Sequence, residues 1–282
     1  MQKPQNVAFL ERGIRRMVSS NNAAHALQVT LANVVLGQMI PNAVVRGGSL
    51  MKLRFGQNTT RFTKDFDAAQ TLAIGAFRDK LVEALRVGWE GFTGIVVDAP
   101  RARSTKRVKF DPVYLMTPFL VKLSYKGHAW ITILLEVSTN EIGDAEKADL
   151  VPVPEEIAQA FETLGFSAPK PIRAMAIEYQ IAQKLHGVTK GGNDRAHDLV
   201  DLQLIANNMR VPYKKVGLIC RRLFAYRKQQ PWPSYINYDN PNWASTYQAA
   251  AQGLAVFQTP EEAVPWGNAF IDKCIRYSKT AK

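Results

Sequence analysis

Cysteine is scarce in this 282-residue chain, which contains only Cys220 and Cys274. Neither cysteine has another metal-ligating residue at the spacing of a zinc site, and the four histidines are scattered. We therefore expect two free thiols in a reducing compartment, with neither a disulfide framework nor a zinc centre.

Long apolar runs are missing as well. No segment approaches the roughly 18 uncharged apolar residues that a membrane-spanning helix needs. The N-terminal residues 1–6 lack the apolar core of a signal peptide. These absences predict a cytoplasmic protein with no membrane partner.

Acidic residues are outnumbered: the chain contains 24 of them and 36 lysines and arginines, which gives a net charge of +12. Such an excess favours a polyanionic partner or anionic substrates. Apolar residues make up 46% of the chain, which is ample for the core of one large domain or of two ordinary ones.

The periodicity of apolar residues changes twice along the chain. The first part mixes helical spacing with short apolar runs and alternating segments, and four prolines near residues 152–171 precede a mostly helical remainder. The pattern predicts an α+β fold: a mixed sheet with flanking helices in residues 1–152 and a helical bundle in residues 153–282. Expected strands are 44–45, 64–69, 92–97, 114–124 and 129–138; expected helices are 7–18, 22–40, 49–55, 73–87, 155–164, 172–187, 195–207, 212–228 and 261–277.

A glycine turn and a pair of acids carry the strongest chemical signal. Gly47, Gly48 and Ser49 follow a short apolar strand, and a helix that begins there would present N–H groups to phosphates. Asp65 and Asp67 are two residues apart, so on a strand they share one face and could hold a divalent cation, Mg²⁺ or Mn²⁺. The alternative is an ordinary solvated pair or a turn, because a short D-x-D match is common.

Glu136 is a candidate third acid, since it interrupts the apolar strand at residues 131–138. A carboxylate on a central strand needs a partner. A metal held by the two aspartates would serve, and Glu136 could also accept a proton from an attacking hydroxyl. An ion pair with Lys122 or Lys126 across the hairpin is the equally weighted alternative.

Lys184 shares an apolar row of its predicted helix, where it either extends outward to water or meets an anion. Asp194, Asp198 and Asp201 stack at positions i, i+4 and i+7 of the next helix. Three stacked acids repel one another unless Arg195, Lys184 or a metal faces them.

Two basic tracts complete the pattern. The first tract lies in a loop that is expected between two strands. The second lies in a stretch that also contains aromatic residues and has no acidic residue between Leu202 and Tyr238. Tracts of one sign with aromatic residues suit a nucleic-acid backbone and stacked bases, and an acidic protein partner would fit as well. The candidate RNA-binding residues are Arg101, Arg103, Arg107, Arg221 and Arg222.

These motifs, in this order, resemble the AbiEii/AbiGii-type abortive-infection toxins of the DNA-polymerase-β-like nucleotidyltransferase superfamily. The gap between Gly48 and Asp65 is somewhat longer than is usual in the superfamily, and His197 stands where the family has Arg or Lys. The segments that carry the resemblance are Gly47-Gly48-Ser49-Leu50, Arg61-Phe62-Thr63-Lys64-Asp65-Phe66-Asp67, Lys184 and His197-Asp198-Leu199-Val200-Asp201-Leu202.

The resemblance implies a magnesium-dependent toxin of a type IV toxin–antitoxin or phage-defence system. Such an enzyme would move a nucleoside monophosphate from an NTP to RNA, with the tRNA 3′ end as the expected acceptor, and so block translation. It also implies a cognate antitoxin encoded nearby. Asp65 and Asp67 would be metal ligands, Lys184 and Asp198 catalytic residues, and Arg61 would brace the aspartates or touch the triphosphate. An aminoglycoside-type nucleotidyltransferase and a non-catalytic nucleic-acid-binding module are the alternatives.

Overall fold

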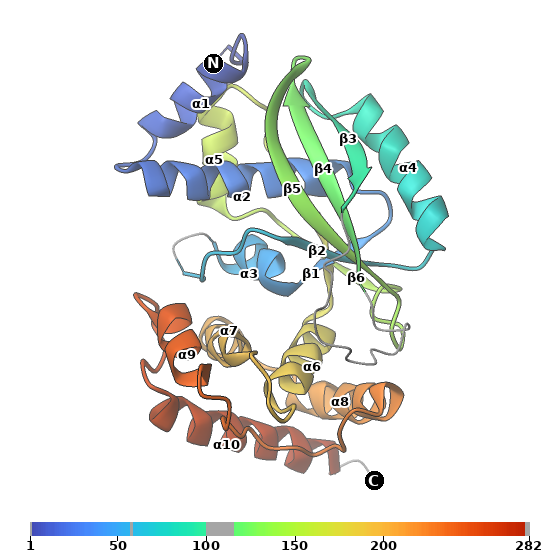
Figure 1. Ribbon diagram of the computed structural model, residues 1–282, viewed down its shortest axis with the longest axis vertical. Helices are drawn as coiled ribbons and strands as arrows, with labels where there is room; N and C mark the ends of the chain where they lie inside the picture. The colour runs from blue at the N-terminus through green and yellow to red at the C-terminus, as the bar shows by residue number, and fades with distance from the viewer. Residues whose placement is uncertain (1, 57–58, 100–115, 280–282) are drawn as a thin grey trace. The chain divides into compact units, whose positions relative to one another are not determined.

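The computed structural model describes residues 2–56, 59–99 and 116–279. It divides into two compact units (Figure 1). The first unit comprises Met1–Gln57 and Phe62–Met175, and the second comprises Asn58–Arg61 and Ala176–Lys282. The units therefore separate after Met175, whereas the sequence pattern placed the boundary at residue 152.

A seven-stranded mixed sheet forms the centre of the first unit, in the order β3-β4-β5-β2-β1-β7-β6. β2 runs parallel to β5 and β1 runs parallel to β7, while the other neighbouring pairs are antiparallel. The strands are β1 (Val44–Arg46), β2 (Phe66–Gln70), β3 (Phe92–Asp98), β4 (Thr117–Tyr125), β5 (His128–Thr139), β6 (Ala148–Val151) and β7 (Ile172–Met175).

Five helices belong to the same unit, and polar side chains fix where the first two begin. Asn6 accepts a hydrogen bond from the N–H of Phe9, and Ser20 accepts one from the N–H of Ala23, as N-cap residues do. α2 is buried along most of its length and packs against β5, β7, α3 and α4. The helices are α1 (Val7–Arg16), α2 (Asn21–Met39), α3 (Gly47–Phe55), α4 (Ile74–Val87) and α5 (Glu155–Thr163).

The last two strands of the sheet were not predicted. Residues 172–175 read as the start of a helix in the sequence, but they form β7, and α6 begins at Ile177. Within β7 only Arg173 is exposed, while its three neighbours are buried. Four residues are too few to establish a period of two, and the partner strand β1 lies far away in the sequence.

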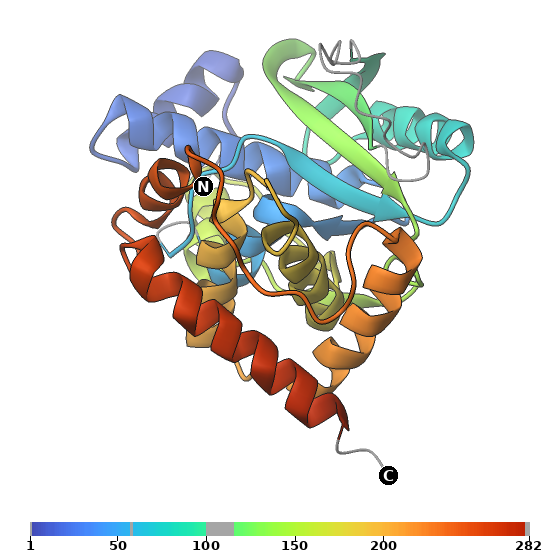
Figure 2. The same cartoon turned by 60° about the horizontal axis from the view of Figure 1, so that its bottom comes forward.

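Among its described residues the second unit has helices and no strand, and its helices pack mainly in pairs. α6 packs against α7 and α8, α7 packs against α9, and α10, the longest of the described helices, packs against α8 (Figures 1 and 2). α9 was not predicted, although Trp243, Tyr247 and Ala251 recur every four residues and are buried. The helices are α6 (Ile177–Val188), α7 (Ala196–Asn208), α8 (Tyr213–Arg227), α9 (Trp243–Ala251) and α10 (Pro260–Lys279).

The predicted fold class is confirmed, because a mixed sheet with flanking helices is followed by a helical unit. Cys220 and Cys274 are free thiols, as predicted, and both are buried. Among the described residues, no helix combines the length and the apolarity that crossing a membrane requires.

Candidate active site

The glycine turn and Asp67 meet at the start of α3. β1 ends at Arg46, and the helix begins at Gly47 with a backbone φ of +64°, a conformation that glycine adopts without strain. A Cβ atom on Gly47 would collide with the carboxylate of Asp67. The carboxylate therefore lies against the first residue of α3, at the positive end of the helix dipole.

Asp65 and Asp67 flank a buried residue. Phe66, the first residue of β2, is fully buried, whereas the two aspartates are partly exposed, which is the alternation expected for acids that share a face. The hydroxyl of Ser49 donates a hydrogen bond to the backbone carbonyl of Asp65. The first turn of α3 thus contacts both acids of the pair, through the Gly47 backbone and through the Ser49 side chain.

Ser49 was predicted to bind phosphate through its hydroxyl. In the structure its side chain is buried and this hydroxyl is engaged with Asp65. The observed contact fixes the entrance to β2 against α3, so the structure gives Ser49 a role in placing the acid pair. Phosphate binding by Ser49 stays a prediction.

A row of charged residues crosses three neighbouring strands. In the sheet register Arg46 of β1 lies opposite Asp67 of β2, and Asp67 lies opposite Glu136 of β5. Residues directly opposite one another project from the same face, so the arginine and the two acids share one side of the sheet. The Arg46 Nη1 donates to Ser138 Oγ at 2.7 Å. Sequence analysis missed Arg46, although it directly precedes the glycine pair.

The register also bears on the alternative ion pair for Glu136. Lys126 Nζ donates to the carbonyl of Pro4 at 2.8 Å. Lys122 lies opposite Thr132 in the β4–β5 ladder, four residues along β5 from Glu136. The register brings Glu136 beside Asp67, and its role as a third acid stays a prediction.

The donor set beside the glycine turn fits a magnesium ion. Within residues 2–56, 59–99 and 116–279, no group of three or more His, Cys, Asp or Glu side chains is placed to hold a metal. Mg²⁺ in proteins is usually bound through one or two carboxylates, with water and substrate phosphates completing its coordination. Asp65 and Asp67 supply such a pair, and the adjacent start of α3 can accept phosphates.

Lys184 lies in a buried ionic network of the second unit. Its Nζ is 2.6 Å from Asp201 Oδ2 and 3.2 Å from Asp198 Oδ1. Arg61 contacts both carboxylate oxygens of Asp201 at 3.1 Å, and Arg195 Nε lies 2.7 Å from Asp198 Oδ2. The expectation that cations face the stacked aspartates is confirmed for Asp198 and Asp201.

Burial and charge act in opposite directions on the two aspartates, whose side chains have no exposed surface. Burial alone would raise the pKa of Asp198, but the charges of Lys184 and Arg195 outweigh it and hold that pKa well below its usual range. The pKa of Asp201 is likewise lowered, because Lys184 and Arg61 overcome the effect of burial. Both carboxylates are therefore ionised at neutral pH.

Close approach of α6 and α7 makes this network possible. Lys184 is 4% exposed and does not extend to water. One helical turn further on, Gly187 lies where a Cβ atom would be 2.7 Å from Asp198 Oδ2. Sequence analysis missed Gly187. Its position three residues after Lys184 is the signal that could have revealed its importance.

The structure groups the predicted site residues by unit. The first unit holds the glycine turn, both metal-binding candidates and Glu136, and the second unit holds Arg61, Lys184 and Asp198. Arg221 and Arg222 are exposed on α8. The remaining candidates, Arg101, Arg103 and Arg107, lie outside the described residues.

Comparison with known proteins agrees with this geometry. The family described as "Nucleotidyl transferase AbiEii toxin, Type IV TA system" matches residues 30–268. MenT4, a nucleotidyltransferase toxin from Mycobacterium tuberculosis H37Rv, is similar in structure, with a TM-score of 0.57 and 15% sequence identity over 98% of this chain and 90% of that one. JHP933 from Helicobacter pylori has a TM-score of 0.49 and 16% identity over 93% and 95% of the two chains. No curated protein sequence matches the chain.

The fold is a mixed sheet with a glycine turn beside paired acids, followed by a helical unit, and the family model that matches most of the chain describes nucleotidyltransferases. The family match spans the glycine turn, the acid pair, Lys184 and Asp198. The chain belongs to the AbiEii family of type IV toxin–antitoxin nucleotidyltransferases. Membership implies an NTP substrate, a divalent metal and an antitoxin partner.

Proposed function

We propose that this enzyme transfers a nucleoside monophosphate from an NTP to the 3′ end of an RNA, with tRNA as the acceptor. The modified tRNA would no longer support translation, and a cognate antitoxin would restrain the enzyme. The acceptor hydroxyl attacks the α-phosphate, a new P–O bond forms, and the bond to pyrophosphate breaks.

The contact of Asp67 with Gly47 supports this proposal most directly. It puts a metal-binding carboxylate beside the helix start that would receive the outer phosphates through Gly47, Gly48 and Ser49. Asp65 and Asp67 would hold Mg²⁺, or Mn²⁺, which supplies charge neutralisation at the phosphates. Glu136, in register beside Asp67, is the candidate acceptor for the proton of the attacking hydroxyl.

The ionic network of the second unit supports roles for its members. Asp198 holds the ammonium group of Lys184, which favours a positioning role for Asp198 and a charge-neutralising role for Lys184 towards phosphate. Arg61 is engaged with Asp201 and precedes Asp65 by four residues in the chain, which favours bracing of the acid segment over direct contact with the triphosphate.

Transfer of labelled nucleotide tests the proposal. The protein is incubated in turn with each α-labelled NTP, Mg²⁺ and total RNA, and the products are separated on a gel. A labelled RNA of tRNA size is expected, and chelation of Mg²⁺ should abolish it. Label on the protein alone, or none on RNA with any NTP, would contradict the RNA acceptor.

The variant Asp67→Asn tests the metal assignment in the same assay. We expect it to reduce transfer by at least about 10²-fold, as removal of one preorganised group does. Asp79→Asn is the control, because Asp79 is exposed on α4 of the same unit. Full transfer by Asp67→Asn would show that the metal assignment is wrong.

A further inference from the structure

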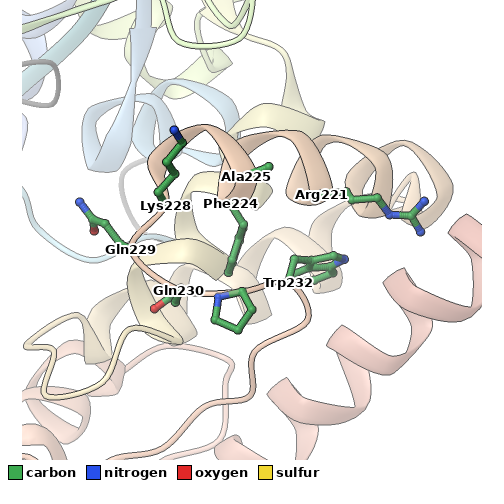
Figure 3. A pocket seen from close by; sticks show the side chains of 8 residues that line it. Arg221, Phe224, Ala225, Lys228, Gln229, Gln230 and Trp232 are labelled. Carbon is green, nitrogen blue, oxygen red and sulfur yellow. The ribbon is translucent and has the colours of Figure 1, made fainter.

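A pocket of about 500 Å³ lies at the C-terminal end of α8 in the second unit (Figure 3). Helix residues Arg221 and Phe224 line it together with Lys228, Gln230 and Trp232 from the segment that follows. Nothing in the proposed transfer chemistry uses this pocket.

We propose that the pocket binds one nucleotide of a single-stranded RNA, with the base against Trp232 and the neighbouring phosphates at Arg221 and Lys228. The inference rests on the proposed RNA acceptor and gives this enzyme a contact with that acceptor apart from the residues of the transfer reaction.

Aromatic residues form one wall of the pocket. Trp232 is partly exposed, and its ring lies 5.0 Å from the ring of Phe224 in an edge-to-face contact. Phe224 is buried and extends from α8 towards Trp232 (Figure 3), and its ring also contacts the ring of His186 at 4.8 Å. The indole is thus supported by a packed ring, as a stacking platform for a base requires.

The charge of the pocket is of one sign. Arg221 and Lys228 are exposed, and none of the described residues that line the pocket is acidic. Burial is the main cause that lowers the pKa of the nearby His186 to about 3, and the charges of Arg227 and Lys190 lower it further. Such a site favours phosphate over a cationic or neutral ligand.

Gln230 lines the pocket with an amide group that is held in place. Its Nε2 donates to the carbonyl of His186 at 2.9 Å and to the hydroxyl of Thr189 at 2.8 Å, which fixes the amide. Its Oε1 is buried and has no hydrogen-bond partner among the described residues. Because this oxygen has no exposed surface, Gln230 contributes to the pocket as a fixed part of its lining and not as an open acceptor.

The spacing of cations favours an RNA strand over a free nucleotide. Lys214 and Arg221 are seven residues apart, which places them on one side of α8 about 10 Å apart, and Lys228 directly follows the last residue of the helix. A mononucleotide would contact only the cations of the pocket, whereas a strand can also bring a further phosphate to Lys214.

Binding of a fluorescein-labelled single-stranded RNA of about 12 nucleotides, measured by anisotropy without NTP, tests this proposal on the full chain. Trp232→Ala should raise the Kd about tenfold, as loss of one stacked base does, and Trp232→Phe should retain most of the affinity. Arg221→Gln should weaken binding and lower the salt slope by about one. Trp266→Ala, which removes another partly exposed tryptophan of the same unit, is the control.

Unchanged Kd values in Trp232→Ala and Arg221→Gln would overturn the proposal. Arg221 is exposed, so the Arg221→Gln variant remains informative if Trp232→Ala fails to fold. ATP and AMP are added as competitors, and displacement of the RNA by either at equal concentration would contradict the strand assignment. Trp232-dependent RNA binding without any nucleotide transfer would refute the proposed function alone.

Discussion

At Gly47 the chain turns from β1 into α3 with a positive φ, and the Asp67 carboxylate fills the space that a side chain would occupy. We expect Gly47→Ala to displace this carboxylate and to lower nucleotidyl transfer by about 10²-fold or more, because catalytic groups misplaced by about 1 Å lose activity on that scale. Initial rates of labelled-NMP transfer check this expectation.

Gly127→Ala separates the collision from backbone strain. Gly127 also has a positive φ, of +80°, but no described atom lies within 4 Å of the position that its Cβ would take. Both variants should lose about 1–2 kcal/mol of stability from the left-handed conformation, while only Gly47→Ala should lose transfer. Equal rates in the two variants would contradict the importance of the Gly47–Asp67 contact.

Sequence reasoning placed the candidate metal ligands on the sheet better than it found the residues that contact them. Alternation around Phe66 was sufficient to place Asp65 and Asp67 on one face. The bond from Arg46 to Ser138 joins residues 92 positions apart on strands that flank β2, and only the strand order brings them together. A single sequence does not contain that order.

At the scale of elements, packing of α6 against α8 buries His186 and lowers its pKa from 6.5 to about 3. Between those values the unfolded chain binds a proton that the folded chain does not, so stability rises with pH by at most about 1.4 kcal/mol per pH unit. This contribution is fully present above pH 6.5 and is lost as pH falls towards 3.

His186→Gln should therefore flatten the dependence of the free energy of unfolding on pH between about 3 and 6.5. Urea unfolding followed at several pH values measures the slope. His128→Gln, at an exposed position of the β4–β5 hairpin, is the control. The same slope in His186→Gln and the parent protein would show that the neutral buried imidazole is not the cause.

The contact between α6 and α7 permits a similar test of Lys184. Lys184→Met leaves the fully buried Asp198 and Asp201 with one cation fewer, and we expect a loss of about 3–5 kcal/mol in the free energy of unfolding. Adding Asp198→Asn should recover much of that loss, since Arg61 still balances Asp201 and the half-exposed Arg195 can turn to water.

Transfer activity of this double variant distinguishes a catalytic Lys184 from a structural one. If Lys184 neutralises phosphate charge, transfer should stay at least about 10²-fold low although stability returns. Recovery of activity together with stability would assign the lysine to the fold alone.

The elements that the sequence predicted well are those with several turns of regular periodicity. α4 buries Phe77, Leu81 and Leu85 on one face, as their spacing indicates. β6 and β7 have four residues each, so they offer too few repeats for a period to stand out. The sheet therefore extends beyond the prolines that marked the predicted boundary.

At the scale of the whole molecule, the net charge of +12 does not by itself distinguish one kind of acceptor from another, but the positions of the cations do. Lys214 and Arg221 lie on one side of α8 and Lys228 directly follows the helix, whereas an enzyme that modifies a small molecule such as an aminoglycoside has no use for an extended basic surface. Reversing charges on this helix should therefore separate an RNA acceptor from a small one.

We expect Arg221→Glu with Arg222→Glu to reduce transfer to RNA by at least about tenfold, with a larger loss at low salt, because lost phosphate contacts weaken binding. Arg15→Glu with Arg16→Glu is the matched control: these adjacent arginines are exposed on α1, and their reversal lowers the net charge by the same amount. Steady-state rates with purified tRNA at two salt concentrations measure both pairs. Equal losses in the two pairs would trace the effect to overall charge, and no loss in either would favour a small-molecule acceptor.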